Sequence, residues 1–224
     1  MHGVRFPPAE TLEDEQYRTA NRWGFLVRFM VRQSSKARRR RHDRFFPLTG
    51  VRPEHKVVDI GCGGYGLRLL EPELDVTGVD LDDWPEYPGR FVQADASEGL
   101  PFGDGEFDLA YSNSVIEHVP PERREAFARE IRRVARGWFI QTPALPFPID
   151  AHSLLPLSHW LPVGARRQYW KLGAGGQFED VRLLRRRDMA EMFGEPVAER
   201  VGGFPKSWIS IRPVEAGTAR DEDA

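Results

Sequence analysis

Two acidic residues and a glycine-rich turn form a pattern that suits a ligand with polar or negatively charged oxygen atoms. The apolar, β-branched residues Val57, Val58 and Ile60 predict a short buried strand. The glycines of residues 61–66 (G-C-G-G-Y-G) prevent this strand from continuing. A helical pattern starts at Leu67, so backbone N–H groups of the turn and helix start face one place. Asp59 precedes the turn. Asp80 ends a second strand pattern about twenty residues later, where a carboxylate accepts ribose hydroxyls in α/β sheets.

The glycines at 61, 63 and 66 also satisfy the pattern G-x-G-x-x-G, which is a weak signal when it stands alone. The same residues could form a tight strand-to-helix turn that binds nothing. Together with the two acids, the pattern leaves two nucleotide-containing cofactors open, nicotinamide dinucleotide and S-adenosylmethionine.

Three further blocks follow the turn at compatible spacings and decide between these cofactors. In chain order, the four blocks are D-I-G-C-G at 59–63, V-D at 79–80, Q-A-D at 93–95 and F-D-L-A-Y-S-N-S-V-I-E-H-V at 107–119. This series resembles the class I S-adenosylmethionine-dependent methyltransferases, in their small-molecule (type 11-like) branch, over about residues 50–142. The resemblance implies an α/β fold: a Rossmann-like, seven-stranded, mostly parallel sheet with helices on both faces and the last strand antiparallel.

The resemblance also implies which residues bind S-adenosylmethionine. It places Asp80 on the ribose, and Asp95 with the backbone at Ala96 against the adenine. The complete implied set is Asp59, Gly61, Cys62, Gly63, Asp80, Leu81, Asp95, Ala96, Ser112, Asn113 and His118. The last glycine of the turn is displaced by one residue from the family pattern. Which of Gly64 and Gly66 approaches the cofactor is therefore left open.

The elements that must position these residues can be placed by pattern. Strands are expected at 57–60, 75–80, 90–93, 107–111 and 138–141, with a final antiparallel pair at 196–201 and 206–211 joined at Gly202 and Gly203. An amphipathic helix is expected from Pro121 through Ala135, ended by Gly137, and a second helix at 187–193 ended by Gly194. Glu117 and His118 are expected on the first turn of a helix.

Residues 144–176 show no regular period and collect prolines, glycines, aromatic residues and histidines. Because long irregular stretches are usually functional, we expect a lid over the acceptor at the carboxyl edge of the sheet. A hydroxyl acceptor would need a base, and His152 is the first candidate, followed by His159 and His118. A zinc site from Asp150, His152 and His159 is conceivable, but no cysteine is near and the spacing is irregular, so we expect no metal.

The chain is expected to form one domain over residues 1–214. It comprises a helical cap (1–50), a cofactor-binding core (51–142), a lid and acceptor insert (143–186) and C-terminal strands (187–214), before a disordered tail (215–224). The cap contains an expected helix at 11–33. Its Tyr17 and Arg18 could contact the methionine carboxylate, although packing and solvation explain them as well.

Composition excludes several other classes. The net charge of −2 argues against bulk nucleic-acid binding, and the single cysteine, Cys62, excludes an internal disulfide framework. We find no apolar run long enough for a membrane span or a secretory leader and expect a soluble cytoplasmic protein. Three alternatives remain: an RNA-acting methyltransferase using the arginine-rich run 32–44, a nicotinamide-dependent oxidoreductase, and a non-catalytic protein that binds S-adenosylmethionine. The sequence leaves the oligomeric state open.

Overall fold

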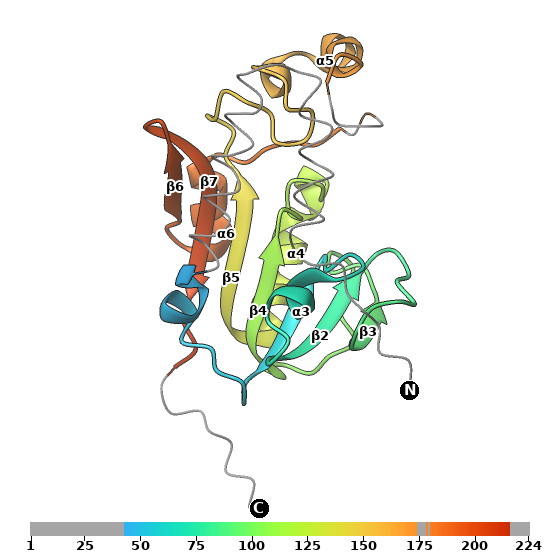
Figure 1. Ribbon diagram of the computed structural model, residues 1–224, viewed down its shortest axis with the longest axis vertical. Coiled ribbons are helices and arrows are strands. Elements are labelled where there is room, and N and C mark those ends of the chain that lie inside the picture. Colours follow the sequence, from blue (N-terminus) through green and yellow to red (C-terminus); the bar gives the residue numbers. More distant parts are fainter. Residues whose placement is uncertain (1–42, 174–177, 179, 216–224) are drawn as a thin grey trace, which may run out of the picture.

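The computed structural model describes residues 43–173, 178 and 180–215 (Figure 1). Its strands are β1 (Lys56–Ile60), β2 (Asp75–Asp80), β3 (Arg90–Gln93), β4 (Phe107–Asn113), β5 (Ala135–Pro143), β6 (Val197–Val201) and β7 (Phe204–Arg212). Its helices are α3 (Gly66–Leu70), α4 (Arg124–Val134), α5 (Val163–Trp170) and α6 (Arg186–Phe193), with 3-10 turns η1 (Pro121–Arg123) and η2 (Ser158–Trp160). The expected helix at 11–33, with Tyr17 and Arg18, and the basic run up to residue 42 lie outside the described residues.

The seven strands form one sheet in the order β3-β2-β1-β4-β5-β7-β6. The pairs from β3 to β5 are parallel, whereas β7 runs antiparallel to both β5 and β6. This confirms the expected α/β architecture, including the antiparallel last strand. From β1 the chain first adds β2 and β3 on one side and then β4 and β5 on the other, so the strand order reverses between β1 and β4. Open α/β sheets bind ligands in the crevice at such a switch point.

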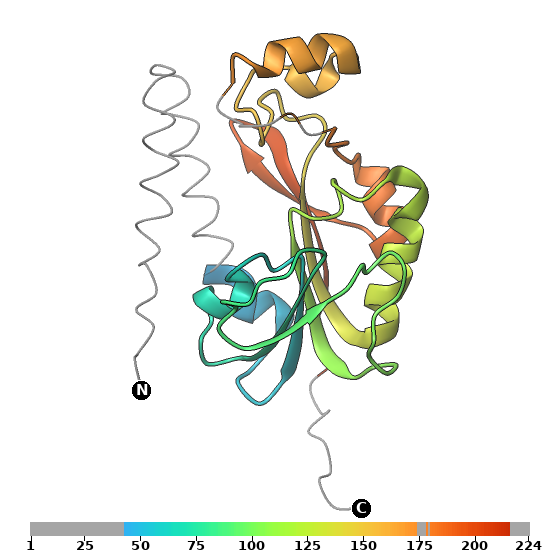
Figure 2. The ribbon, with the colours of Figure 1, turned by 90° about the vertical axis from the view of Figure 1, so that its right-hand side faces the viewer.

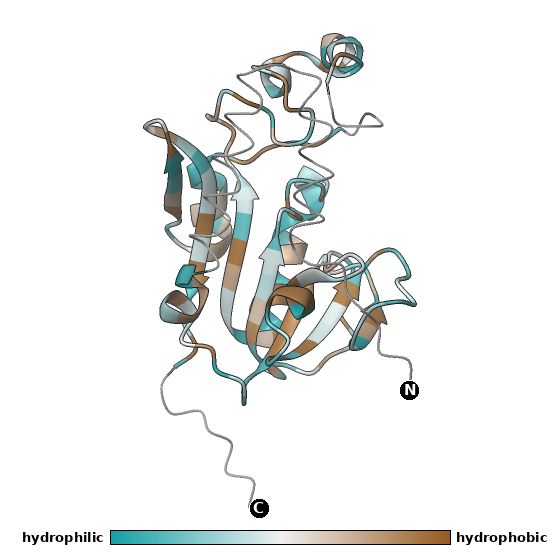
Figure 3. Cartoon of the chain, in the orientation of Figure 1, coloured by the Kyte–Doolittle hydropathy of each residue, from teal (hydrophilic) through white to brown (hydrophobic). Residues whose placement is uncertain are grey.

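The sheet is buried on both faces, because alternate side chains of its central strands point into two separate cores. One core joins the sheet to α4 and α6, and its sheet members include Val58, Ala110 and Ile140. The opposite core joins the sheet to α3 and the helical residues 43–49, and its sheet members include Val57, Leu109 and Phe139. Figure 2 shows these helices on the two sides of the sheet, and Figure 3 shows apolar residues concentrated along the central strands.

Several element boundaries differ from the sequence prediction. Helix α4 ends at Val134, so Ala135 and Gly137 belong to β5, where they pair with Phe107 and Leu109 of β4. A Cβ at Gly137 would lie 2.7 Å from the carbonyl oxygen of Arg212, so this glycine allows a close approach of β7 and does not end a helix. Strand β4 also continues through Asn113, two residues beyond its expected end.

The C-terminal hairpin and α6 form as predicted. Gly202 and Gly203 connect β6 to β7 with φ angles of 57° and 84°, the left-handed backbone that a two-residue hairpin turn requires. Gly194 follows the last residue of α6 with a φ of 78°. Within the described residues, no helix has the length and apolar character needed to cross a membrane.

The segment after β5 contains regular structure that the sequence did not indicate. Residues 158–160 form η2 and residues 163–170 form α5, inside the stretch expected to be irregular. Only Arg166 and Trp170 of α5 are buried, so the helix lacks the apolar stripe by which an amphipathic helix is recognised. Figure 1 shows this segment beyond the carboxyl ends of β4 and β5.

Packing of α4 on the sheet predicts that removing its largest buried side chain is costly. Phe127 is 2% exposed, so Phe127→Ala should lower the free energy of unfolding by about 3–5 kcal/mol. Phe204, 54% exposed, provides a matched control, and Phe204→Ala should cost less than about 1 kcal/mol. Urea denaturation followed by circular dichroism measures both. Equal losses for the two variants would contradict the assignment of α4 to the core.

Candidate cofactor and acceptor site

The glycine-rich loop leaves the end of β1 and turns back over β2. The N–H groups of Gly61 and Cys62 donate to the carbonyl oxygen of Val79 at 2.8 and 3.2 Å. Gly61 has a φ of 76°, and a Cβ there would overlap the side chain of Val115. Gly63 has a φ of 55°, but apart from its chain neighbours no atom of the described residues lies within 4 Å of the position that its Cβ would take. The loop therefore packs tightly at Gly61 and borders open space at Gly63.

Asp59 anchors this loop from below. Its Oδ2 accepts the N–H of Leu67 at 2.5 Å, across the whole turn. Burial, opposed by this hydrogen bond and reinforced by the charge of Asp80, raises the pKa of Asp59 to about 7. A Cβ at Gly66, whose φ is 51°, would overlap the Asp59 carboxylate. The displaced last glycine of the motif is thus explained by its contact with Asp59.

The other two loop residues of interest face the protein. A Cβ at Gly64 would lie 3.1 Å from the Trp84 ring, so its Cβ position is covered by an aromatic side chain. Cys62 is buried, and burial together with the charges of Asp59 and Asp80 raises the pKa of its thiol. Cys62 can therefore contribute its backbone to a ligand site, but its protonated, inward-facing thiol cannot act as a nucleophile.

Asp80 and Asp95 lie at the carboxyl ends of β2 and β3 with half-buried side chains. Asp80 accepts the N–H of Gly63 at 2.8 Å and that of Asp82 at 3.1 Å. Asp95 Oδ1 accepts both the N–H and the hydroxyl of Ser97 at 2.7 Å, and its Oδ2 lies 3.5 Å from an Arg123 nitrogen. Each acid therefore also fixes its own loop.

The residues after these two acids differ in exposure. Leu81 is 63% exposed beside the Asp80 loop, whereas Ala96 is buried. A ligand lying along this edge of the sheet would thus find an apolar side chain at Leu81 and only backbone at Ala96.

The chain turns sharply after β4. Ser114 has a φ of 61°, and its N–H and hydroxyl donate to the main-chain and side-chain oxygens of Gln141 at 2.9 and 3.1 Å. Ser112 is buried and Asn113 half-buried. Glu117 and His118 lie in the turn that follows, not on the first turn of a helix, since η1 begins only at Pro121.

Glu117 is a buried acid, 1% exposed, that the sequence analysis did not include among the site residues. Its Oε2 accepts the Thr142 hydroxyl at 2.9 Å, while its Oε1 has no hydrogen-bond partner in the part of the chain that the structure describes. Burial raises the pKa of Glu117 to about 7, against the lowering effect of hydrogen bonds and of Arg124. Arg124 itself donates to the carbonyl oxygens of Val119 and Glu117, which fixes this turn.

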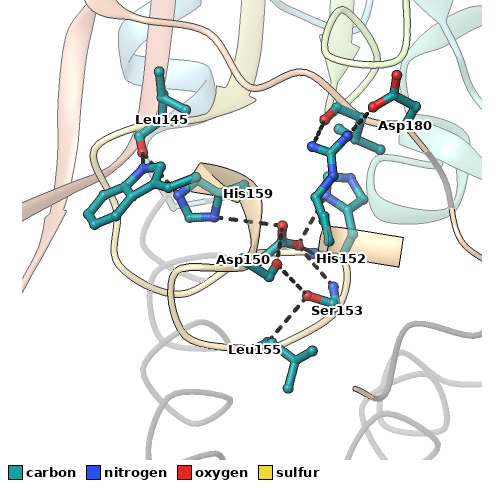
Figure 4. Close-up of polar contacts among 11 residues, drawn as sticks. Leu145, Asp150, His152, Ser153, Leu155, His159 and Asp180 are labelled. Carbon is teal, nitrogen blue, oxygen red and sulfur yellow. Dashed lines mark hydrogen bonds and ion pairs between the residues drawn. The ribbon is translucent and has the colours of Figure 1, made fainter. Parts of the chain in front are cut away.

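The loop from 150 to 159 is built around the carboxylate of Asp150 (Figure 4). Its Oδ1 accepts the N–H groups of His152 and Ser153 at 2.8 and 2.9 Å. Its Oδ2 accepts the hydroxyl of Ser158 at 2.9 Å and lies 3.6 Å from Nδ1 of His159. Burial alone would raise the pKa of Asp150, but contacts with His159 and these donors hold it well below its usual range. Asp150 is therefore a charged anchor.

The three candidate histidines occupy different environments. His159 is buried, with Nε2 3.1 Å from the Leu145 carbonyl oxygen and Nδ1 facing Asp150, so both ring nitrogens face protein oxygen atoms. His152 Nε2 lies 3.9 Å from Glu117 Oε1, and the His118 and His152 rings stand nearly perpendicular with centroids 5.0 Å apart. The structure thus brings His118 and His152 together beside Glu117 and places His159 elsewhere.

A cavity of about 200 Å³ adjoins the turn after β4. Its lining residues are Glu117, His118, Val119, Pro120, Pro121, Glu122, Asp180 and Arg182. Glu117 and His118 therefore form part of its wall, whereas His152 is not among its lining residues.

Burial of Asp59 predicts a pH dependence of stability. The pKa of Asp59 is 3.8 in the unfolded chain and about 7 in the folded protein. Between about pH 4 and pH 7, the folded state therefore retains a proton that the unfolded state has lost. The free energy of unfolding should therefore fall as pH rises from about 4 to about 7, by at most about 4 kcal/mol from this group. Asp59→Asn cannot titrate, yet its amide oxygen can still accept the Leu67 N–H.

Urea denaturation across this pH range should show a shallower fall for Asp59→Asn than for the wild type. Near-UV circular dichroism checks that the variant keeps its fold. A variant with the wild-type slope would assign the pH dependence to other acids.

Comparison with known proteins identifies the fold and the domain. Residues 58–140 match the model of a methyltransferase domain. An uncharacterized methyltransferase of Synechocystis is 32% identical over 95 residues, which cover 38% of this chain and 44% of that protein. Cycloartenol-C-24-methyltransferase 1 of rice (Oryza sativa) is 31% identical over 118 residues, which cover 44% of this chain and 34% of the relative.

A solved structure extends the likeness to most of the chain. The crystal structure of the PH0226 protein from Pyrococcus horikoshii shares the fold with a TM-score of 0.56 at 19% identity, and the match covers 84% of this chain and 92% of that one. By contrast, the chain spans less than half of the length of either curated relative. The matched region contains the glycine loop, Asp80, Asp95 and Glu117. Residues 58–140 therefore match a methyltransferase domain, and the likeness to the solved structure shows that the fold is shared.

Proposed function

We propose that this protein transfers the methyl group of S-adenosylmethionine to a small-molecule acceptor. The observation that supports this most is the methyltransferase-domain match over residues 58–140, on a chain whose glycine loop ends β1 at the switch point of the sheet. The match favours this function over the nicotinamide-dependent alternative, which would use the same loop and Asp80.

The loop fits the proposed cofactor because one side of it is open. Space beside Gly63, unlike the filled positions at Gly61 and Gly66, allows a ligand to approach the backbone. We assign the ribose to Asp80 and the adenine to Asp95 and the backbone of Ala96. A carboxylate oxygen accepts more than one hydrogen bond, so the loop contacts of these acids leave capacity for a ligand. The other proposed contacts are Asp59, Gly61, Cys62, Leu81, Ser112, Asn113 and His118.

Bound S-adenosylmethionine would supply an activated methyl group on a good leaving group. The task of the protein is therefore to hold the acceptor atom in line with that group and to exclude water, which can accelerate a reaction by several orders of magnitude. The segment 144–170 lies beyond the carboxyl ends of β4 and β5 and is the element suited to cover the acceptor. Asp150, with its full set of contacts, keeps that segment folded.

The acceptor side is assigned to the region of Glu117, His118 and His152. A cavity of about 200 Å³ there is smaller than the roughly 300–1,000 Å³ of sites that enclose whole ligands, so it would take part of an acceptor. His152 and His118 face this region, whereas His159 is buried within its own loop. Of the three histidines predicted to act on the acceptor, we therefore retain His152 and His118. The location we propose is the cytoplasm, because the one cysteine, Cys62, requires no oxidising compartment.

Calorimetric titration with S-adenosylhomocysteine tests the cofactor assignment. The wild type should bind it, and NADH should not compete. Asp80→Asn should weaken binding by about tenfold or more, since it loses a charge-assisted hydrogen bond. Asp82→Asn is the matched control: only its backbone N–H contacts Asp80, so binding should stay within about twofold.

Two results would reject the proposal. Wild-type protein that binds NADH and not S-adenosylhomocysteine would assign the loop to an oxidoreductase. The second result is tight binding of S-adenosylhomocysteine without methyl transfer to any acceptor. If mass spectrometry detects no methylated product in a broad set of hydroxylated and amine compounds, a non-catalytic binding protein is favoured.

A further inference from the structure

We infer that Glu117, His118 and His152 form a site for one divalent transition-metal ion, with zinc as the preferred occupant, which binds an oxygen atom of the acceptor. The position of the acceptor rests on the proposed function, whereas metal binding does not. This assignment replaces the sequence-based expectation of no metal and differs from the set first considered, which joined His152 to Asp150 and His159.

The geometry of the three side chains supports a shared ligand. One ligand atom from each residue can be chosen so that all lie within 4.8 Å of one another. Ligands at 2.0–2.1 Å from a tetrahedral zinc ion lie about 3.3 Å apart, so the cluster needs to close by roughly 1.5 Å at most. This movement would fall on His118, which is exposed, and on His152, which lies in a loop, because Glu117 is buried.

Glu117 gives the independent evidence that something belongs in the cluster. The residue is 1% exposed, and its Oε1 has no hydrogen-bond partner among the described residues although it faces His152 Nε2 at 3.9 Å. Buried carboxylate oxygens almost always have a partner, because leaving one without costs free energy. A cation between Glu117 and the two imidazoles would satisfy this oxygen.

The surrounding residues resemble the supports that metal ligands have in proteins. The hydroxyl of Thr142 fixes the other oxygen of Glu117 at 2.9 Å. On the far side of the His152 ring, Nδ1 lies 3.9 Å from Oδ1 of Asp150, an ion-pair contact that is longer than a hydrogen bond. Metal sites often place a carboxylate behind a histidine ligand, where a hydrogen bond orients the ring.

The donor set selects the metal. Two imidazoles and one carboxylate suit zinc and other transition metals, whereas Mg²⁺ and Ca²⁺ prefer oxygen ligands throughout. Three protein ligands also leave a fourth position open, as in catalytic zinc sites. Two of the three ligand residues, Glu117 and His118, line the cavity in which we place part of the acceptor.

This arrangement specifies the acceptor as a compound with a hydroxyl group. Bound to the ion, the hydroxyl becomes more acidic and releases its proton to water. An oxygen lone pair then forms the new bond to the methyl carbon. The carbon–sulfur bond breaks with its electron pair going to sulfur, which yields the methyl ether and S-adenosylhomocysteine.

Metal binding is tested directly on untagged protein that has been dialysed against a chelator. Titration calorimetry with zinc should show one equivalent bound, and Co²⁺ in its place should give the visible spectrum of a four-coordinate ion. Glu117→Gln, His118→Ala and His152→Ala should each weaken zinc binding by at least about tenfold. His159→Gln, which changes the neighbouring imidazole of the same loop, should leave it within about threefold.

The outcomes separate the two proposals. Wild-type protein that binds no zinc, or a loss in His159→Gln without one in His118→Ala, overturns the metal site. S-adenosylhomocysteine titrated into the same metal-free samples should bind to the wild type and to Glu117→Gln alike. If it binds and zinc does not, only the metal site fails. If zinc binds and S-adenosylhomocysteine does not, only the cofactor assignment fails.

Discussion

The hydrogen bond from the Leu67 N–H to the buried carboxylate of Asp59 ties β1 to α3, and the shape of the glycine loop depends on it. The carboxylate occupies the space where a side chain at Gly66 would begin, while Val115 occupies the corresponding space at Gly61. The loop is thus fixed from beneath by an acid and from the side by the turn after β4. Among the loop glycines, Gly63 alone has open space at its Cβ position within the described structure, so the glycines of one motif are required for different physical reasons.

Two other buried acids show how environment separates residues of the same chemistry. Asp150 has its oxygens filled by backbone and hydroxyl donors and stays ionised, which makes it the anchor of a loop. Glu117 has one filled oxygen and one without a partner in the described structure, and its pKa is raised. An acid that folding leaves incompletely satisfied is available to a ligand, whereas a fully satisfied one is not.

The sequence predicted the central strands well because Val57 on one face of β1, and Val58 and Ile60 on the other, are apolar. It predicted the hairpin because Gly202 and Gly203 permit the left-handed backbone of a tight turn. It misplaced the end of α4, where pairing of Ala135 with Phe107 outweighed helical periodicity. It missed α5, which buries too few residues to show a period. Of the residues proposed for the acceptor side, it named His152 and His118 but not Glu117, because tertiary contacts alone reveal a buried carboxylate with an unfilled oxygen.

The path of the chain between β5 and β7 has an evolutionary consequence. Ala144 forms a bridge with Leu184, and the N–H of Leu145 donates to the Leu184 carbonyl oxygen at 3.0 Å, so the chain leaves the end of β5 and returns to it at adjacent points before α6 begins. The entropy cost of closing such an excursion grows only slowly with its length. Related chains can therefore lengthen, shorten or exchange this excursion, while the strands that carry the glycine loop stay unchanged.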